Sequence, residues 1–335
     1  PSLCIHCSLG CHTVASGRYR EVVRQEARYS EAVNGYFICD RGRYGFFYTS
    51  DEDRPRQAVV DGKEVSYDQA IRDAREKLKE LIKSTGPDAV ACVSSERSSL
   101  ETQAMLEKIC QTKGWHGPSY FVDGSMTQKV KSASSRLESG LAVSLREVES
   151  ADFILVVGAD PINEAPMLAL AMRQAQRSGG RIAVIDPRPV SLPFEFHHLH
   201  VTPDEVNLCA GLLVKAAVDL EATTDIEQSG IEFYQAIPPL ETVSPSLQDQ
   251  ISKVAQKLRE SNRPIVVCGT ETVRQTTPEL AADQTLLLQA ANKQAGLFYL
   301  MPGANSFSAS MLAGEDGSFL ETLEGIEKGI IKGLI

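Results

Sequence analysis

The chain has 335 residues, of which 42% are hydrophobic and 23% charged, a composition typical of a globular protein and unlike a disordered or collagen-like chain. Its 34 basic and 44 acidic residues give a formal net charge of −10, which argues against binding nucleic acid through phosphate contacts. No apolar run approaches the roughly 20 residues needed to cross a bilayer, so we expect no direct membrane insertion.

Residues 1–55 are rich in Arg and Tyr, show little helical periodicity, and hold four of the eight cysteines. Cys4, Cys7, Cys11 and Cys39 follow the spacing C-x2-C-x3-C-x27-C. Three thiolates from one tight loop suit three corners of a [4Fe–4S] cluster, and the distant Cys39 supplies the fourth. A structural zinc ion normally uses two separated cysteine pairs. The spacing therefore favours a cluster, with a zinc site or no metal as the alternatives. We expect the other four, solitary cysteines to be small buried hydrophobic side chains.

From about residue 64, helix-like and strand-like segments alternate. Ser66 to Gln69 form a capping pattern that opens a helix, and Gly86-Pro87 ends it. The apolar positions between them share one face, which predicts an amphipathic helix that faces inward. Five short runs rich in Val, Ile or Leu read as buried parallel strands, which predicts a doubly wound α/β fold. These runs are Ala89 to Val93, Phe153 to Val157, Arg181 to Ile185, Pro264 to Cys268 and Leu297 to Met301.

Two breaks in the pattern suggest domain boundaries. Three prolines interrupt residues 237–245, and glycines gather in residues 114–125. We therefore expect mostly parallel sheets in two α/β units, one inserted in the other, behind a small cysteine-rich iron–sulfur domain. The expected division is 1–55 for that domain, 56–125 plus 246–335 for a discontinuous α/β domain, and 126–245 for the inserted α/β domain. Because a strand-like run reaches Ile335 without a cap, we also expect this α/β domain to be truncated here, as part of a longer polypeptide.

Two segments carry a resemblance to a known family. Cys4-Ile5-His6-Cys7-Ser8-Leu9-Gly10-Cys11, followed by Val33-Asn34-Gly35-Tyr36-Phe37-Ile38-Cys39-Asp40-Arg41-Gly42-Arg43-Tyr44-Gly45, resemble the [4Fe–4S] domain that opens the molybdopterin oxidoreductase superfamily. The chain is most similar there to the large iron–sulfur subunit of NADH–quinone oxidoreductase. This resemblance implies an oxidoreductase that holds a [4Fe–4S] cluster and works with other redox subunits of a multi-subunit complex. It implies a cytoplasmic location, peripheral to the inner membrane through those partners.

The resemblance extends to two turns that follow predicted strands. The segment from Ala151 to Pro161 is similar to the turn at which active members hold a pterin guanine dinucleotide, and Ile185-Asp186-Pro187-Arg188 is similar to the motif whose Asp holds the guanine. Open α/β sheets bind ligands at the carboxyl ends of their strands, although either turn alone is also typical of an ordinary strand end. If molybdopterin guanine dinucleotide is bound, the contacts implied are Gly158, Asp160, Pro161, Asp186 and Arg188.

The sequence also departs from the family pattern. Residues 119–126 correspond to the region that supplies the protein ligand of molybdenum or tungsten, and they hold no cysteine. A cysteine-ligated metal is excluded there; Asp123 or Ser125 is chemically able to serve, but Asp123-Gly124 is typical of a turn. Arg41 and Arg43 stand where formate-dehydrogenase-like members have a Lys. We expect these two residues to offset the negative charge of the cluster, with a solvated basic turn as the alternative.

The leading hypothesis is an electron-transfer module with no catalytic residue of its own, working within an NADH dehydrogenase-like complex. One alternative is a catalytic molybdenum or tungsten bis-pterin oxidoreductase, such as a formate dehydrogenase. The other is a zinc-stapled interaction domain without redox function.

Overall fold

The computed structural model describes residues 1–221, 223, 226–291, 293–314 and 317–335. The contacts between Cα atoms divide the chain into two units, each assembled from three separate segments. Unit 1 comprises Pro1–Thr13, Ala27–Cys39 and Gln128–Ala304, and unit 2 comprises Val14–Glu26, Asp40–Thr127 and Asn305–Ile335.

Unit 1 is built on a five-stranded parallel sheet with the strand order β10-β9-β8-β11-β12. All five residues of the central strand β8 are buried, and its Leu155 pairs with Ala183 of β9 on one side and with Val266 of β11 on the other. Such continuous apolar strands require cover on both faces of the sheet. The strands are β8 (Phe153–Val157), β9 (Arg181–Ile185), β10 (His197–Leu199), β11 (Pro264–Gly269) and β12 (Gly296–Leu300).

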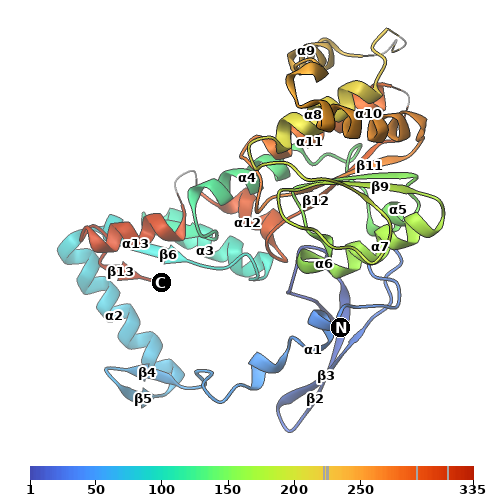
Figure 1. Cartoon of the computed structure of the whole chain (residues 1–335). Helices are drawn as coiled ribbons and strands as arrows, with labels where there is room; N and C mark the ends of the chain where they lie inside the picture. Colours follow the sequence, from blue (N-terminus) through green and yellow to red (C-terminus); the bar gives the residue numbers. More distant parts are fainter. Residues whose placement is uncertain (222, 224–225, 292, 315–316) are drawn as a thin grey trace. The chain divides into compact units, whose positions relative to one another are not determined.

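Figure 1 shows α8, α10 and α11 on one face of this sheet and α5, α6 and α7 on the other, so the doubly wound arrangement is confirmed for this unit. Helix α10 illustrates why the sequence is helical here: the hydroxyl of Ser244 accepts from Leu247 N at 3.4 Å, and Pro245 occupies the first turn. The helices are α5 (Leu145–Glu149), α6 (Pro161–Glu164), α7 (Pro166–Arg177), α8 (Val206–Ala217), α9 (Gln228–Ala236), α10 (Pro245–Glu260) and α11 (Thr277–Ala290).

The structure departs from the expected division at residues 237–245. Strands β11 and β12 lie in the same sheet as β8 and β9, whereas we expected them in a separate unit. The physical reason is that the backbone of the central strand β8 has hydrogen-bonding groups along both of its edges. Strand β9 pairs with one edge and β11 with the other. The proline-rich stretch forms only a short turn, η3 (Leu240–Thr242), before α10.

Unit 2 contains a smaller parallel sheet with the order β13-β6-β7. Strand β13 confirms the strand that was expected near the end of the sequence. An antiparallel hairpin, β4 with β5, precedes α2. The elements are η1 (Phe47–Ser50), β4 (Ala58–Val60), β5 (Lys63–Val65), η2 (Pro87–Ala89), β6 (Val90–Val93), α3 (Leu100–Lys113), β7 (His116–Ser119), α12 (Ser306–Leu312), α13 (Phe319–Glu327) and β13 (Gly333–Leu334); α4 (Gly124–Arg136) begins in this unit and ends in unit 1.

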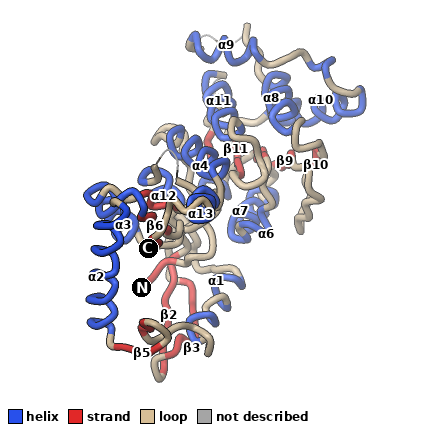
Figure 2. Tube along the Cα trace, turned by 90° about the vertical axis from the view of Figure 1, so that its left-hand side faces the viewer, coloured by secondary structure: helices blue, strands red, loops and turns tan. Residues whose placement is uncertain are grey.

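Helix α2 (Tyr67–Thr85) follows β5 as one long helix, as Figure 2 shows. Its ends are as predicted: the hydroxyl of Ser66 accepts from Gln69 N at 3.3 Å, and Gly86 follows the last turn with a φ of +93°. The expectation that its apolar face points inward was wrong, because no residue of α2 is buried and Ile71 is 53% exposed. Periodicity gives the face of a helix but not the element that covers it.

The N-terminal strands β1 (Ser2–Leu3), β2 (His12–Arg18) and β3 (Glu21–Ala27) form a sheet in that order, and the short helix α1 (Asp40–Tyr44) begins directly after Cys39. Among the described residues, no helix is both long and apolar enough to span a membrane.

Candidate metal centre

The cysteine loop is closed at its base by strand pairing. Residues of β1 and β2 pair in antiparallel register, Leu3 with His12, and the N–H of Cys4 donates to the carbonyl oxygen of Cys11 at 2.8 Å. This pairing sets Cys4 beside Cys11 and leaves Cys7 on the loop between them. Gly10 turns the chain with a φ of +69°, a conformation that suits glycine.

Cys39 reaches the same place from a separate segment. Cys4 and Cys11 are buried in the hydrophobic core of unit 1, and Cys7 and Cys39 pack against it. Burial, followed by the charges of Cys7, Cys4 and Cys39, raises the pKa of the Cys11 thiol to about 12. Because such electrostatic effects fall with distance, all four sulfurs share one neighbourhood. All eight cysteines are thiols.

The spacing of these thiols bears on which metal they suit. Within the described part of the chain, no group of three or more His, Cys, Asp or Glu side chains is placed to hold a metal ion. Around one zinc ion the sulfurs lie about 2.3 Å from the metal and so about 3.8 Å from one another. In a [4Fe–4S] cluster each thiolate binds a different iron atom, so the ligands are spread farther apart. Four thiols that pack on one core supply the four sulfur ligands that a [4Fe–4S] cluster takes.

The core of unit 1 holds the loop in place. Leu9 and Ile38, each two residues or fewer from a cysteine, lie buried in that core. The N–H of Met301, which follows β12, donates to the hydroxyl oxygen of Ser8 at 3.1 Å. The loop is therefore fixed to the main sheet of its unit both by apolar packing and by a hydrogen bond. Such support keeps ligands in position before a metal binds.

The two arginines expected near the cluster lie on α1, which starts at the residue after Cys39. Arg41 is exposed and Arg43 is partly buried, at the basic last turn of that helix. Their expected role in the environment of the cluster remains a prediction.

The second candidate site, for a pterin dinucleotide, lies at the carboxyl end of the large sheet. Strand order reverses between β8 and β11, which is where open α/β sheets form their ligand crevice. Gly158 follows β8 with a φ of +61°, and a Cβ atom there would lie 2.1 Å from Cγ1 of Val273. A Cβ atom on Gly269, at the end of β11, would lie 2.1 Å from the carbonyl oxygen of Gly158. The chain itself therefore packs closely into this crevice.

Asp160 and Pro161 serve the helix that starts there. Asp160 caps α6: its carboxylate accepts from Asn163 N at 3.2 Å and from Asn163 Nδ2 at 2.7 Å, and Pro161 occupies the first turn. The N–H of Asp160 donates to Glu164 Oε1 at 3.0 Å. These contacts satisfy the turn from within the chain.

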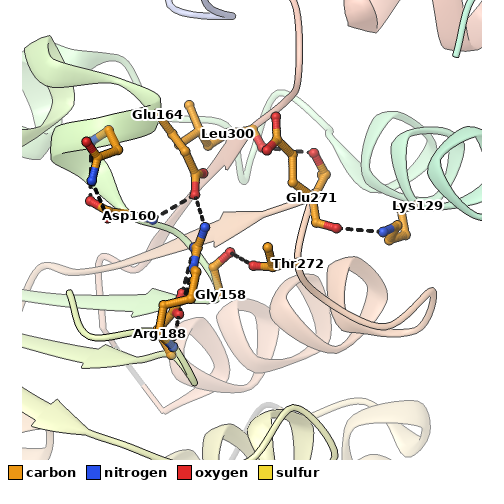
Figure 3. A network of polar contacts seen from close by, with 11 residues as sticks. Lys129, Gly158, Asp160, Glu164, Arg188, Glu271, Thr272 and Leu300 are labelled. Atoms are coloured by element: carbon orange, nitrogen blue, oxygen red, sulfur yellow. Dashed lines mark hydrogen bonds and ion pairs between the residues drawn. The ribbon is translucent and has the colours of Figure 1, made fainter. Parts of the chain in front are cut away.

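Asp186 and Arg188 bind each other rather than facing an open site. Asp186 has no exposed surface, and its carboxylate accepts from Arg188 N, Nε and Nη2 at 2.8, 2.9 and 2.8 Å. Figure 3 shows the guanidinium of Arg188 also reaching Glu164, with Nη1 and Oε1 2.9 Å apart. The hydrogen bond to Asp186 is the largest of the effects that raise the pKa of Arg188. Burial raises the pKa of Glu164, and Arg188 opposes that rise.

The residues at this edge therefore do not fit a pterin dinucleotide. The carboxylate expected to hold the guanine is paired inside the chain, and the side chain of Val273 packs against the glycine turn. In the region expected to supply a metal ligand, Asp123 is a turn residue, with its Oδ1 accepting from Met126 N at 2.7 Å at the start of α4.

Three residues that shape these two sites could not be predicted from the sequence. Glu164 and Val273 lie at the crevice, and Asn34 makes several hydrogen bonds beside the cysteine loop. The Asn34-Gly35 pair signals a turn, but the turn alone does not show which distant carbonyls the side chain reaches. Two of the cysteines taken as solitary, Cys92 of β6 and Cys110 of α3, are buried as expected but lie in contact, each affecting the pKa of the other.

Comparison with known proteins agrees with these features. Residues 1–51 match the molybdopterin oxidoreductase Fe4S4 domain, and residues 60–333 match the molybdopterin oxidoreductase family. The G subunit of NADH-quinone oxidoreductase from Pseudomonas putida is 30% identical over 94% of this chain and 35% of its own length. The corresponding subunit from Escherichia coli K12 is 28% identical over 98% of this chain and 37% of its own length. The chain thus spans just over a third of the curated relatives that it matches.

Among solved structures, acetylene hydratase from Pelobacter acetylenicus is similar with a TM-score of 0.60 and 13% identity, over 86% of this chain and 42% of that one. A chain of the formyltransferase/hydrolase complex from Methylorubrum extorquens has a TM-score of 0.51 and 14% identity, over 83% of this chain and 74% of that one. At these identities the likeness shows the fold. Together with the match over residues 60–333, it leads to one conclusion: the chain belongs to the molybdopterin oxidoreductase family and begins with the family's Fe4S4 domain.

Proposed function

We propose that this chain is an electron-transfer module in which Cys4, Cys7, Cys11 and Cys39 hold a [4Fe–4S] cluster. The observation that carries the proposal is that Cys39, from a separate segment, packs against the same core as the three cysteines of the β1–β2 loop. A bound cluster supplies one-electron transfer. The protein's contribution is to bind iron through four thiolates and to shield the site with Leu9 and Ile38. Arg41 and Arg43 add positive charge next to Cys39 in sequence, which favours the reduced state.

The partners proposed are other redox subunits of an NADH dehydrogenase-like complex. By name, the curated relatives are subunits of NADH-quinone oxidoreductase. The segment leading to Cys39 exposes Tyr36 and Phe37, which are 74% and 63% accessible and line a cavity of about 850 Å³. Exposed aromatic side chains are enriched at protein interfaces. We place the chain on the cytoplasmic side, held at the inner membrane through those partners.

The pterin role is not part of this proposal. Asp186 and Arg188 are paired with each other, so the function proposed requires no chemistry at the carboxyl edge of the sheet. In this view the large sheet is a scaffold that fixes the cysteine loop, through Ser8 and the core.

Low-temperature EPR of the dithionite-reduced protein, purified without oxygen, tests the ligand set. The wild-type chain should give the paramagnetic signal of a reduced [4Fe–4S] cluster. Cys39→Ala should lose that signal, because a methyl group cannot bind iron. Cys209→Ala is the matched control, since Cys209 is fully buried in α8 and is not among the four proposed ligands.

A signal that survives in Cys39→Ala as in wild type would show that Cys39 is not a ligand. A colourless wild-type protein that is silent in EPR and binds zinc would overturn the electron-transfer proposal itself.

A further inference from the structure

The side chain of Asn34 joins three separate stretches of backbone beside the cysteine loop. It is only 3% exposed. Its Oδ1 accepts from His12 N at 2.8 Å. Its Nδ2 donates its two hydrogens to the carbonyl oxygens of Phe37 and Arg28 at 3.0 and 3.2 Å, and shares one of them with the carbonyl oxygen of His12 at 3.4 Å. A buried primary amide with both ends used in this way links the segments that it contacts.

The backbone of Asn34 is itself held firmly. Ser30 and Gly35 exchange two hydrogen bonds, at 2.8 and 3.2 Å, which close a short loop around it. The N–H of Phe37 donates to the carbonyl oxygen of Asn34 at 2.9 Å. Gly35 has a φ of +51°, which allows the chain to turn immediately after Asn34. The side chain therefore projects from a turn that is closed by backbone hydrogen bonds.

The partners of Asn34 stand next to the proposed ligands. His12 follows Cys11 directly, and Phe37 precedes Cys39 by two residues. One amide, through its bonds to His12 and Phe37, thus connects the end of the three-cysteine loop to the approach of the fourth cysteine.

We infer that Asn34 is a positioning residue that fixes Cys39 against the loop carrying Cys4, Cys7 and Cys11. This inference rests on the proposed cluster and adds how the distant ligand is placed. Removing the amide takes a hydrogen-bond partner from the N–H of His12 and from the carbonyl oxygens of Phe37 and Arg28 in a partly buried place, which destabilises that arrangement. The carbonyl oxygen of His12 still accepts from Arg28 N at 2.9 Å. Residues that orient metal ligands typically change metal affinity by about 10-fold to 100-fold when they are replaced.

The test compares the rate of iron loss to a chelator and the midpoint potential of the cluster in wild type, Asn34→Ala and Asn34→Asp. Asn34→Ala should release iron about tenfold faster than wild type and shift the midpoint potential. Asn34→Asp keeps the shape and the acceptor for His12 N but loses the donor to the carbonyl of Phe37. It should therefore behave like Asn34→Ala, and it serves as the second variant if Asn34→Ala does not fold.

Asn207→Ala is the matched control. The amide of Asn207 in α8 also bridges two partners, accepting from Thr277 Oγ1 at 2.6 Å and donating to Thr276 Oγ1 at 3.0 Å. Its loss should leave the rate of iron release and the potential as in wild type.

Two results would overturn the inference while leaving the cluster in place. One is an Asn34→Ala protein whose iron release and potential match those of wild type. The other is an Asn34→Asp protein whose iron release and potential match those of wild type. That result would mean that the hydrogen bond to Phe37 has no role in placing Cys39. A wild-type chain that binds no iron would instead refute the proposed function.

Discussion

At Gly158 the backbone turn leaves no room for a side chain. The residue has a φ of +61°, and an added Cβ atom would lie 2.1 Å from Val273 Cγ1. Gly158→Ala should therefore lower the free energy of unfolding by about 2 kcal/mol, from backbone strain and overpacking together. Urea denaturation measures the change. Adding Val273→Ala to Gly158→Ala should recover part of the lost stability.

Gly179→Ala separates the two causes. Gly179 also has a positive φ, +97°, but nothing lies within 4 Å of its added Cβ atom. Gly179→Ala should lower the free energy of unfolding through backbone strain alone, by about 1 kcal/mol. Equal losses at Gly158 and Gly179, with no recovery from Val273→Ala, would show that the crevice is not packed as described.

The buried ion pair of Asp186 with Arg188 should contribute more to stability than an exposed ion pair does. Asp186→Asn removes a fully buried carboxylate that accepts three hydrogen bonds from Arg188. Breaking a buried pair on one side costs about 3 kcal/mol. The exposed pair of Asp249 with Lys253 is the control, and Asp249→Asn should cost less than about 1 kcal/mol. If both variants lose the same stability, the carboxylate of Asp186 is not held by this pair and remains available to a ligand.

Single residues were predictable where their chemistry is local. The four clustered cysteines and the Asp123 turn follow from spacing and residue type alone. Val273 and Glu164 did not follow, because each reaches its partner only after strands far apart in sequence have paired. Asn34 lay within a recognised motif, yet its three carbonyl partners come from residues 12, 28 and 37, which no local pattern relates.

The central strand β8 and the helix α2 differ in how deeply their apolar side chains are buried. Leu155 in β8 is 1% exposed and Ile71 in α2 is 53% exposed. Leu155→Ala should lower the free energy of unfolding by about 3 kcal/mol because it leaves a cavity on a buried face of the sheet. Ile71→Ala should change it by less than about 0.5 kcal/mol. Denaturation of both variants gives the comparison; a large loss for Ile71→Ala would mean that α2 is covered after all.

Element type was easier to predict than element neighbours. All five predicted strands exist, within two residues of their expected ends, because buried parallel strands are short apolar runs. Strand β10 was not among the five; its His-His-Leu run is too short and too polar to stand out. The pairing of β8 with β11 was also missed, because parallel partners are chosen by packing across more than a hundred residues of sequence.

On the scale of the whole molecule, the chain crosses several times between its two units. The expected break near residues 114–125 lies close to the change of unit at Thr127, whereas the proline-rich stretch at 237–245 falls inside unit 1. Prolines end helices, but they do not by themselves end a unit when the next strand joins the same sheet. The N-terminal segments that carry the four cysteines belong to unit 1, together with the large sheet.

The function proposed requires that the four N-terminal thiols hold an iron–sulfur cluster on a scaffold without a pterin. The most direct test is to purify the protein anaerobically and to quantify iron, acid-labile sulfide, zinc, molybdenum and tungsten in the same sample. We predict about four iron and four sulfide per chain, with neither molybdenum nor tungsten in stoichiometric amount. One zinc per chain without iron would refute the cluster, and one molybdenum or tungsten per chain would refute the absence of a pterin.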